Sequence, residues 1–350
     1  MLKKLKKDIN RELRAFLKDP GIVPGKNPIF GLLYSGIRDF VQRGGKRIRP
    51  LLMLISYQGY SKRRHPDYKK LIRSSLSLEL LHDFFLIHDD VIDRSDLRRG
   101  KPTLHRVFNS RLSRKAKDEI GPNLSIAAGD TLFAMAVSAL LSSDEPPSRK
   151  EKALEEFVRA AASTGTGEFI DILGNIKKIE NVTEKDVFLT YTLKTARYTF
   201  ECPLLTGGIL AGAQKKELKK LSALGLALGH AFQIQDDLLD IFSSSKETGK
   251  PVLSDLNESK KTLLVWKTYT SLRGKDKKLL KHLLEKKKKT YSDLLRFRKL
   301  IKETGAHEYC LKKTKSMLLE ADATIGKLRM KKKYKAALKE LVRSIFSKIG

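Results

Sequence analysis

The stretch LSLELLHDFFLIHDDVI, residues 76–92, joins a long apolar run to a dense group of acidic side chains. Its apolar residues recur at intervals of three and four and cover nearly every face, which is typical of a helix enclosed by other helices. On such a helix Asp89, Asp93 and the following Asp96 share one face, whereas Asp90 is rotated by about 100° from Asp89. A row of like charges at the end of an apolar helix is destabilising unless something binds it.

A divalent cation would reverse that effect, because Mg²⁺ takes one or two carboxylates together with waters and phosphate oxygens. A single DDxxD pattern also arises by chance at charge-rich helix ends. The pattern recurs, however, in AFQIQDDLLDIF, residues 231–242, where Asp236, Asp237 and Asp240 again end an apolar run. If the two helices lie side by side, two carboxylate clusters face each other across a gap that holds several Mg²⁺ ions and a polyanion.

The rest of the chain also has the pattern of buried and amphipathic helices. Residues 153–173 and 218–242 are apolar on nearly every face, and Lys-rich amphipathic segments cover about 275–350. Gly and Pro clusters separate these segments, and the sequence lacks a sustained period-two alternation. With 350 residues and 41% hydrophobic content, the sequence predicts one all-α domain, residues 1–350, with several helices enclosed by others.

Composition restricts the class of protein and its compartment. Lys and Arg total 71 against 40 Asp and Glu, so the formal charge of +31 favours nucleic acid, acidic membranes or phosphorylated small molecules as partners.

Two distant cysteines, Cys202 and Cys310, predict a reducing compartment without disulfides or zinc. The charged N-terminal segment lacks the apolar core of a signal peptide. The apolar run 124–141 contains Asp130, which favours a buried helix over a membrane span. We therefore expect a cytoplasmic protein.

Basic side chains accompany the aspartates. GGKRIRP, residues 44–50, places Lys46, Arg47 and Arg49 at a glycine turn just before a helix, and helix N-termini with nearby cations bind anions. Further cations follow an aspartate set or stand within a helix: Arg98, Arg99, Lys194, Lys250 and Lys260. In a chain this basic most single cations are solvated surface groups, so only their placement beside the carboxylates distinguishes them. Guanidinium groups suit bidentate phosphate contacts.

These motifs resemble, in their order along the chain, those of the trans-isoprenyl diphosphate synthases, also called polyprenyl synthetases. The matching segments span roughly residues 44–262 and are GGKRIRP, ELLHDFFLIHDDVIDRSDLRRGKPTLH, AGDTLFA, YTLKTA, FQIQDDLLD and GKPVLSDLNESKKT. The resemblance implies an all-α helical bundle around a deep central cavity, usually as a homodimer. It also implies a head-to-tail condensation of isopentenyl diphosphate with allylic diphosphates that depends on Mg²⁺, with Mn²⁺ as a substitute.

The resemblance also implies roles for individual residues. The Mg²⁺ ligands would be Asp89, Asp90, Asp93 and Asp236, with support from Asp237 and Asp240. The allylic diphosphate would contact Arg98, Lys194, Gln233 and Lys250, with Lys260 nearby and Thr195 close to the reacting carbons. Isopentenyl diphosphate would bind Lys46, Arg49, His82 and Arg99. The catalytic set would be Asp89, Asp90, Asp93, Lys194 and Asp236.

Three positions depart from the usual pattern of that family without removing a metal ligand. Glu168 stands where the family often has Gln, Ser254 where a Gly commonly precedes Asp255, and Leu264 where a Pro often follows Lys-Thr-Leu. The added negative charge of Glu168 could weaken diphosphate binding.

Phe84 and Phe85 lie about one turn before Asp89 and bear on the size of the product. Ordinary core packing is one interpretation of these rings. If the growing chain runs along this helix, they instead form a floor beneath it, and in the family aromatic residues at these positions go with short products. We therefore predict farnesyl (C15) or geranylgeranyl (C20) diphosphate as the product, and not C30 or longer.

Other functions compete with this hypothesis. A terpene cyclase or head-to-head condensing enzyme shares the fold, but the FQxxDDxxD form of the second set and the GGKRIRP segment favour elongation. His82-Asp83 or His88-Asp89 would suit an HD-type metal phosphohydrolase, which leaves the second aspartate set unexplained. A non-catalytic basic protein is the third alternative, yet both aspartate sets are intact, and nucleic-acid motifs are absent from the sequence. The positive charge could still bring the enzyme to anionic membranes.

Overall fold

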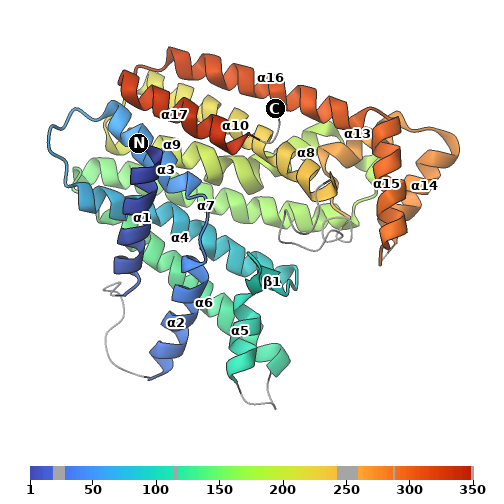
Figure 1. The fold of residues 1–350 in the computed structure, drawn as a ribbon, viewed down its shortest axis with the longest axis horizontal. Coiled ribbons are helices and arrows are strands. Elements are labelled where there is room, and N and C mark those ends of the chain that lie inside the picture. The colour runs from blue at the N-terminus through green and yellow to red at the C-terminus, as the bar shows by residue number, and fades with distance from the viewer. Residues whose placement is uncertain (19–27, 113–116, 243–258, 287, 348–350) are drawn as a thin grey trace. The chain divides into compact units, whose positions relative to one another are not determined.

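The computed structural model describes residues 1–18, 28–112, 117–242, 259–286 and 288–347. Over these residues the chain is helical apart from turns, loops and one two-stranded hairpin, so the predicted all-α class is confirmed (Figure 1). The contacts divide the chain into two compact units, residues 1–155 with 206–213 and residues 156–205 with 214–350. The assignment of a single domain to residues 1–350 stays a prediction.

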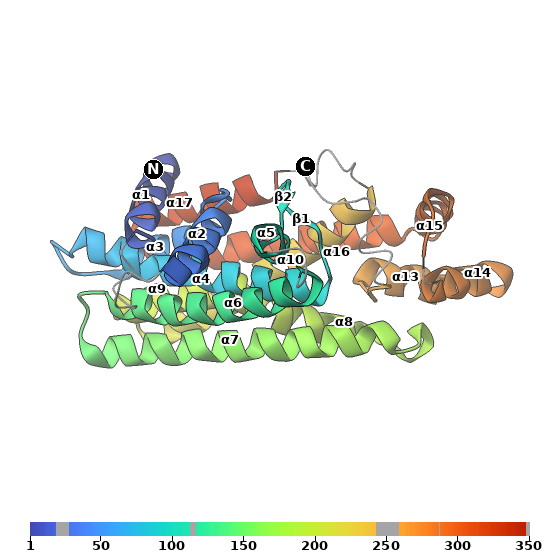
Figure 2. The ribbon, with the colours of Figure 1, turned by 90° about the horizontal axis from the view of Figure 1, so that it is seen from below.

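The first unit contains the helix that carries the first aspartate set. Its elements are α1 (Leu2–Phe16), α2 (Pro28–Gln42), α3 (Ile48–Tyr60), α4 (Tyr68–Ile92), β1 (Leu97–Arg98), β2 (Lys101–Pro102), α5 (Leu104–Arg111) and α6 (Lys117–Leu141). Asp67 caps α4, because its side chain accepts the backbone N–H of Lys70. α4 packs along α6 (Figure 2), and the hydroxyl of Ser74 donates to the carbonyl oxygen of Leu140, 2.9 Å away. Because a serine side chain is small and its hydroxyl is hydrogen-bonded here, α4 can be enclosed by other helices at this position.

α6 corresponds to the apolar run of the sequence. From Ile120 to Leu141 it is the one helix, among the residues that the structure describes, that is long and apolar enough to cross a membrane. Inside the unit it packs against α4 and α5, and 44% of the most apolar stretch of the helix is buried. These contacts are those expected of a core helix in a helical bundle.

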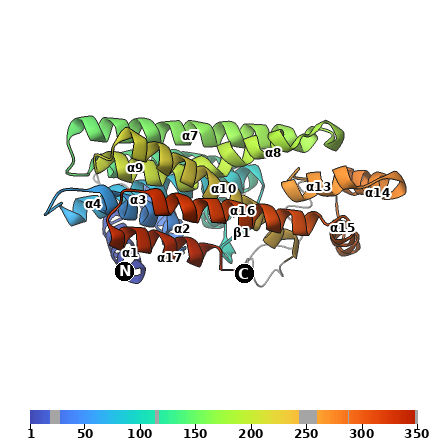
Figure 3. The same cartoon turned by 90° about the horizontal axis from the view of Figure 1, so that it is seen from above.

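The second unit is built around the helix that carries the second aspartate set. Its elements are most of α7 (Pro147–Ile176), η2 (Ile179–Asn181), α8 (Glu184–Thr190), the π-helix η3 (Tyr191–Glu201), the start of α9 (Cys202–Leu210), α10 (Lys215–Phe242), α13 (Leu263–Ser271), α14 (Gly274–Glu285), α15 (Tyr291–Glu303), α16 (Ala306–Lys327) and α17 (Lys332–Ile345). α16 runs beside α10 (Figure 3). η3 lies on α10 at two glycines, since a Cβ on Gly225 or Gly229 would stand 2.4 or 2.3 Å from the Cα of Glu201 or Ala196.

Candidate active site

The first aspartate set divides into outward and inward side chains at the end of α4. Asp93 is exposed and Asp89 is half-buried, whereas Asp90 is only 1% exposed. One oxygen of Asp90 accepts hydrogen bonds from Nε and Nη2 of Arg98, at 2.8 and 2.5 Å. Burial nevertheless raises the pKa of Asp90, although the charge of Arg98 opposes the shift. The helical rotation of about 100° between neighbours therefore turns Asp90 into the protein.

A tight hairpin brings the following arginines back to α4. Leu97 pairs with Pro102 and Arg98 with Lys101. The two residues of the turn, Arg99 and Gly100, both have positive φ angles of 54° and 72°, as a type I′ turn requires. This turn lets Arg99 donate from Nη1 to the carbonyl oxygen of Gly44 at 2.7 Å, so the hairpin is tied to the GGKRIRP segment.

The GGKRIRP segment enters α3 through left-handed backbone. Gly44, Gly45 and Arg47 have φ angles of 95°, 148° and 56°, which favour glycine at the first two positions. Lys46 is exposed, whereas Arg47 is 4% exposed and points inward. Arg47 donates from Nη1 to Glu79 at 2.5 Å, and its other nitrogens reach a side-chain oxygen of Asn10 and a backbone carbonyl. Arg47 therefore fixes this segment to α4 through the carboxylate of Glu79.

Two buried carboxylates on α4, Glu79 and Asp83, have no predicted role in the diphosphate sites, and Asp83 was named only for the HD-type alternative. They are 2% and 0% exposed and lie four residues apart on one face of the helix. Arg99 comes within 3.5 Å of Asp83. Burial and the charge of Glu79 raise the pKa of Asp83 to about 7 against the opposing effect of nearby arginines. Two acidic residues at positions i and i+4 inside an apolar helix were the available signal, because buried carboxylates need cationic partners.

His82 lies on the same helix among these arginines. Burial, followed by the charges of Arg49 and Arg99, holds the pKa of His82 well below its ordinary value. The imidazole is therefore neutral near pH 7, so it can take part in hydrogen bonds without carrying a charge.

An aromatic cluster lies one turn deeper along α4. The ring of Phe84 stands 5.0 Å from Phe85, 4.5 Å from His88 and 5.4 Å from Phe133 of α6, between ring centroids. Gly129 of α6 leaves room for this contact, since a Cβ there would stand 2.4 Å from Nε2 of His88. Both predicted floor residues, Phe84 and Phe85, are half-buried.

The second aspartate set shows the same division on α10. Asp236 is exposed and Asp240 is half-buried, whereas Asp237 is 6% exposed. One oxygen of Asp237 accepts from Nε2 of Gln233 at 3.0 Å, and the other accepts from the hydroxyl of Tyr191. Burial and the charge of Asp237 raise the pKa of Tyr191 well above its ordinary value. Both oxygens of Asp237 are thus bound within the second unit.

Thr195 extends the hydrogen-bond network around Asp237, and its neighbour Lys194 binds two other carboxylates. The hydroxyl of Thr195 donates to Oε1 of Gln233 at 2.7 Å, so Thr195, Gln233 and Asp237 form a continuous chain of hydrogen bonds. Lys194 precedes Thr195 on the π-helix, and its Nζ lies 2.7 Å from a carboxylate oxygen of Glu168 and 2.7 Å from one of Asp171. π-helices frequently mark functional positions.

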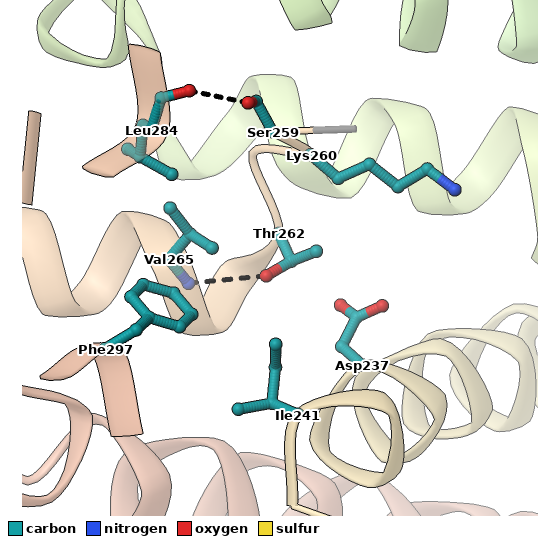
Figure 4. A pocket seen from close by; sticks show the side chains of 8 residues that line it. All are labelled: Asp237, Ile241, Ser259, Lys260, Thr262, Val265, Leu284 and Phe297. Carbon is teal, nitrogen blue, oxygen red and sulfur yellow. Dashed lines mark hydrogen bonds between the residues drawn. The ribbon is translucent and has the colours of Figure 1, made fainter. Parts of the chain in front are cut away.

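A small pocket adjoins Asp237 in the second unit (Figure 4). It is lined by Asp237, Ile241, Ser259, Lys260, Thr262, Val265, Leu284 and Phe297. Two hydrogen bonds shape its wall: Ser259 donates to the carbonyl oxygen of Leu284 at 2.6 Å, and the backbone N–H of Val265 donates to Thr262 at 3.3 Å. Lys260 therefore lines the same pocket as Asp237. Lys250, the other predicted lysine of this segment, lies outside the described residues.

The outward carboxylates suit a metal ion that is shared with a ligand. Within residues that the structure describes, no three His, Cys, Asp or Glu side chains converge closely enough to enclose an ion by themselves. Asp89 and Asp93, like Asp236 and Asp240, are instead pairs four residues apart on the outward side of a helix. Mg²⁺ bound by one or two carboxylates completes its octahedron with waters and phosphate oxygens, so these donor sets fit a metal–phosphate complex.

Comparison with known proteins finds the same family throughout. The sequence profile of polyprenyl synthetase matches residues 31–301. The geranylgeranyl diphosphate synthase of Saccharolobus solfataricus is 35% identical over 262 residues, 74% of this chain and 73% of that protein. The farnesyl diphosphate synthase of Geobacillus stearothermophilus is 33% identical over 250 residues, 69% of this chain and 76% of that protein. A crystal structure of a geranylgeranyl pyrophosphate synthase from Corynebacterium glutamicum, complexed with isoprenyl diphosphate and magnesium, has a TM-score of 0.89, 26% identity and 99% coverage of both chains.

Proposed function

This chain belongs to the polyprenyl synthetase family, and on that premise we propose that it condenses isopentenyl diphosphate head to tail with allylic diphosphates. The product is a short-chain trans-prenyl diphosphate, farnesyl (C15) or geranylgeranyl (C20). The observation that carries the proposal is the family match over residues 31–301, which includes both aspartate sets and the GGKRIRP segment. The relatives named geranylgeranyl and farnesyl diphosphate synthase support this chain length, and two others are named geranylfarnesyl diphosphate synthase.

Mg²⁺, or Mn²⁺ in its place, supplies Lewis-acid stabilisation of the leaving diphosphate when it is bound. The outward carboxylates of each set would be its ligands: Asp89 and Asp93 in the first set, and Asp236 and Asp240 in the second. Asp90 and Asp237 orient the two sets from inside, because Arg98 binds Asp90 and because Tyr191 and Gln233 bind Asp237. The metal-ligand role that the resemblance implies for Asp90 and Asp237 stays a prediction beside this positioning role.

Basic and polar side chains neutralise and position the two diphosphates. Lys194, Lys250 and Lys260, with Arg98 and Gln233, act on the allylic diphosphate, and Thr195 lies near the reacting carbons. Loss of that diphosphate leaves an allylic carbocation, which the π-bond of isopentenyl diphosphate attacks. A proton then passes to the departing diphosphate. Preorganised cations stabilise the charge that develops on the leaving group, and apolar helix walls exclude the water that would hydrolyse the cation.

The second diphosphate, that of isopentenyl diphosphate, is bound by Lys46, Arg49, His82 and Arg99. Arg99 is prepared for this role by its bond to Gly44 and by its approach to Asp83. His82 contributes a hydrogen bond, since its low pKa keeps it neutral. Phe84 and Phe85 form the floor that limits product length.

A homodimer is part of the proposal. Four large apolar side chains on α7 follow one helical stripe at positions i, i+3, i+4 and i+7 and are exposed: Phe169 (65%), Ile172 (44%), Leu173 (48%) and Ile176 (82%). A second copy of the chain would cover such a stripe.

We further propose that the enzyme is cytoplasmic and that it contacts anionic membranes through its charge of +31. Co-sedimentation with vesicles of rising anionic lipid content tests the membrane contact. If sedimentation does not rise with anionic lipid, the membrane contact is wrong.

The test is product analysis. The purified protein is incubated with Mg²⁺, labelled isopentenyl diphosphate and each of the C5, C10 and C15 allylic diphosphates, and the dephosphorylated products are sized. We expect a C15 or C20 product that disappears with EDTA and in Asp89→Ala. A terpene cyclase would instead consume the allylic substrate and leave isopentenyl diphosphate untouched, and no incorporation with any primer would overturn the proposal.

A further inference from the structure

Lys194 is held by two carboxylates and not by one. Its ammonium nitrogen lies 2.7 Å from Glu168 and 2.7 Å from Asp171, and all three side chains are at most 24% exposed. Together the three groups carry one net negative charge. A second ammonium, that of Lys261, lies near Asp171 but donates to the carbonyl oxygen of Asn175 at 2.8 Å.

This arrangement follows from the close approach of α7 to the π-helix. A Cβ on Gly167 would stand 2.4 Å from the backbone nitrogen of Lys194, so only glycine allows the two helices to lie this near. Glu168 follows Gly167 directly, and Asp171 is three residues further along the same helix face. The carboxylate of Glu168 is therefore placed on Lys194 by backbone geometry.

We propose that Glu168 makes the enzyme discriminate between metal-complexed and metal-free diphosphate. The inference rests on the proposed function, in which Lys194 binds the allylic diphosphate. An incoming diphosphate competes with Glu168 for the ammonium and brings its own negative charge beside that carboxylate. A divalent cation removes this repulsion, whereas a free diphosphate meets it in full. Gln, which the resembling family often has at this position, would keep the shape and hydrogen-bonding capacity of the side chain without its charge.

The experiment measures binding of inorganic diphosphate by calorimetry, with EDTA and with saturating Mg²⁺, for the wild type and Glu168→Gln. We expect the metal-free dissociation constant to fall about tenfold in the variant, as the loss of one nearby unit charge predicts. The constant with Mg²⁺ changes less, so the ratio of the two constants shrinks. Thermal unfolding of each variant establishes that it is folded.

Two further variants separate a local effect from a general one. Glu156→Gln makes the same substitution on the same helix at a side chain of similar exposure, which pairs with Arg159 at 3.0 Å, and it should leave both constants unchanged. In a Lys194→Met background, Glu168→Gln should lose the part of its effect that comes from competition for the ammonium and keep the part that comes from direct repulsion.

The outcomes distinguish this inference from the proposed function. If Glu168→Gln binds metal-free diphosphate no more tightly than the wild type, or if Glu156→Gln gains as much, the inference is overturned while the proposed function stands. If the wild type binds no Mg²⁺–diphosphate and forms no prenyl product, the proposed function fails and the inference with it.

Discussion

Asp83 is the buried side chain whose ionisation should control stability. Its folded-state pKa of about 7 exceeds the ordinary value of about 3.9. Between these values the folded state binds the extra proton, so the free energy of unfolding falls as pH rises through this window, by up to about 1.4 kcal/mol per pH unit. The charged groups that face Asp83 are Glu79, Arg47, Arg49 and Arg99. We predict that Asp83→Asn flattens this dependence.

Thermal unfolding of wild type and variant at several pH values from 4.5 to 7.5 measures the effect. Asp39→Asn is the control, because Asp39 forms an ion pair with Arg43 and its side chain is 43% exposed. It should keep the wild-type slope. An unchanged slope in Asp83→Asn would show that Asp83 is not the titrating group.

The residues within each aspartate set were separable from local geometry alone. The rotation between neighbouring helix positions predicts that Asp90 leaves the face of Asp89 and Asp93, and the structure buries it. The partners of the inward residues were not predictable in this way. Asp237 is bound by Tyr191, which lies 46 residues earlier in the chain.

At the scale of elements, the long helices followed from periodicity, but two short structures did not. The type I′ turn at Arg99-Gly100 places an arginine at positive φ, where sequence rules look for Asn, Asp or Gly. The π-helix η3 has no periodicity signal of its own, and its approach to α10 depends on Gly225 and Gly229 in a distant segment. Both elements carry residues that are proposed to bind diphosphate. The positions of these residues therefore depend on tertiary contacts that local sequence patterns do not predict.

α4 should also set the length of the product. Phe84 and Phe85 lie about one turn before Asp89, and their rings pack into the aromatic cluster with Phe133. We predict that the double substitution Phe84→Ala with Phe85→Ala lengthens the prenyl product beyond that of the wild type, because it opens the floor beneath the growing chain. Chromatography of the dephosphorylated products measures the distribution.

The control for this prediction is Tyr291→Ala, which removes an aromatic ring that is 62% exposed on α15. It should keep the wild-type distribution. If the double variant does so as well while remaining active, the two rings are core packing and the floor lies elsewhere.

At the scale of the whole molecule, the exposed stripe on α7 predicts self-association. Replacing Phe169 and Ile176 by Glu puts charges where a second copy would bury apolar side chains, so we expect a shift from dimer to monomer. Sedimentation velocity measures it. Leu319→Glu, at an apolar side chain of α16 that is 74% exposed, is the matched control and should leave the mass unchanged. A wild type that sediments as a monomer would contradict the prediction.

The sequence by itself determined the helical class, the family and the positions of the acidic and basic motifs. The helical class follows from local spacing, because residues three and four apart share a helix face whatever surrounds the helix. The family follows from the resemblance of the motifs and of their order along the chain. Only the tertiary structure decided which partner each inward charge binds. Arg47 to Glu79, Tyr191 to Asp237 and Lys194 to Glu168 are contacts between segments far apart in the chain, and their formation depends on how helices pack. Spacing within a single segment carries no information about such pairs.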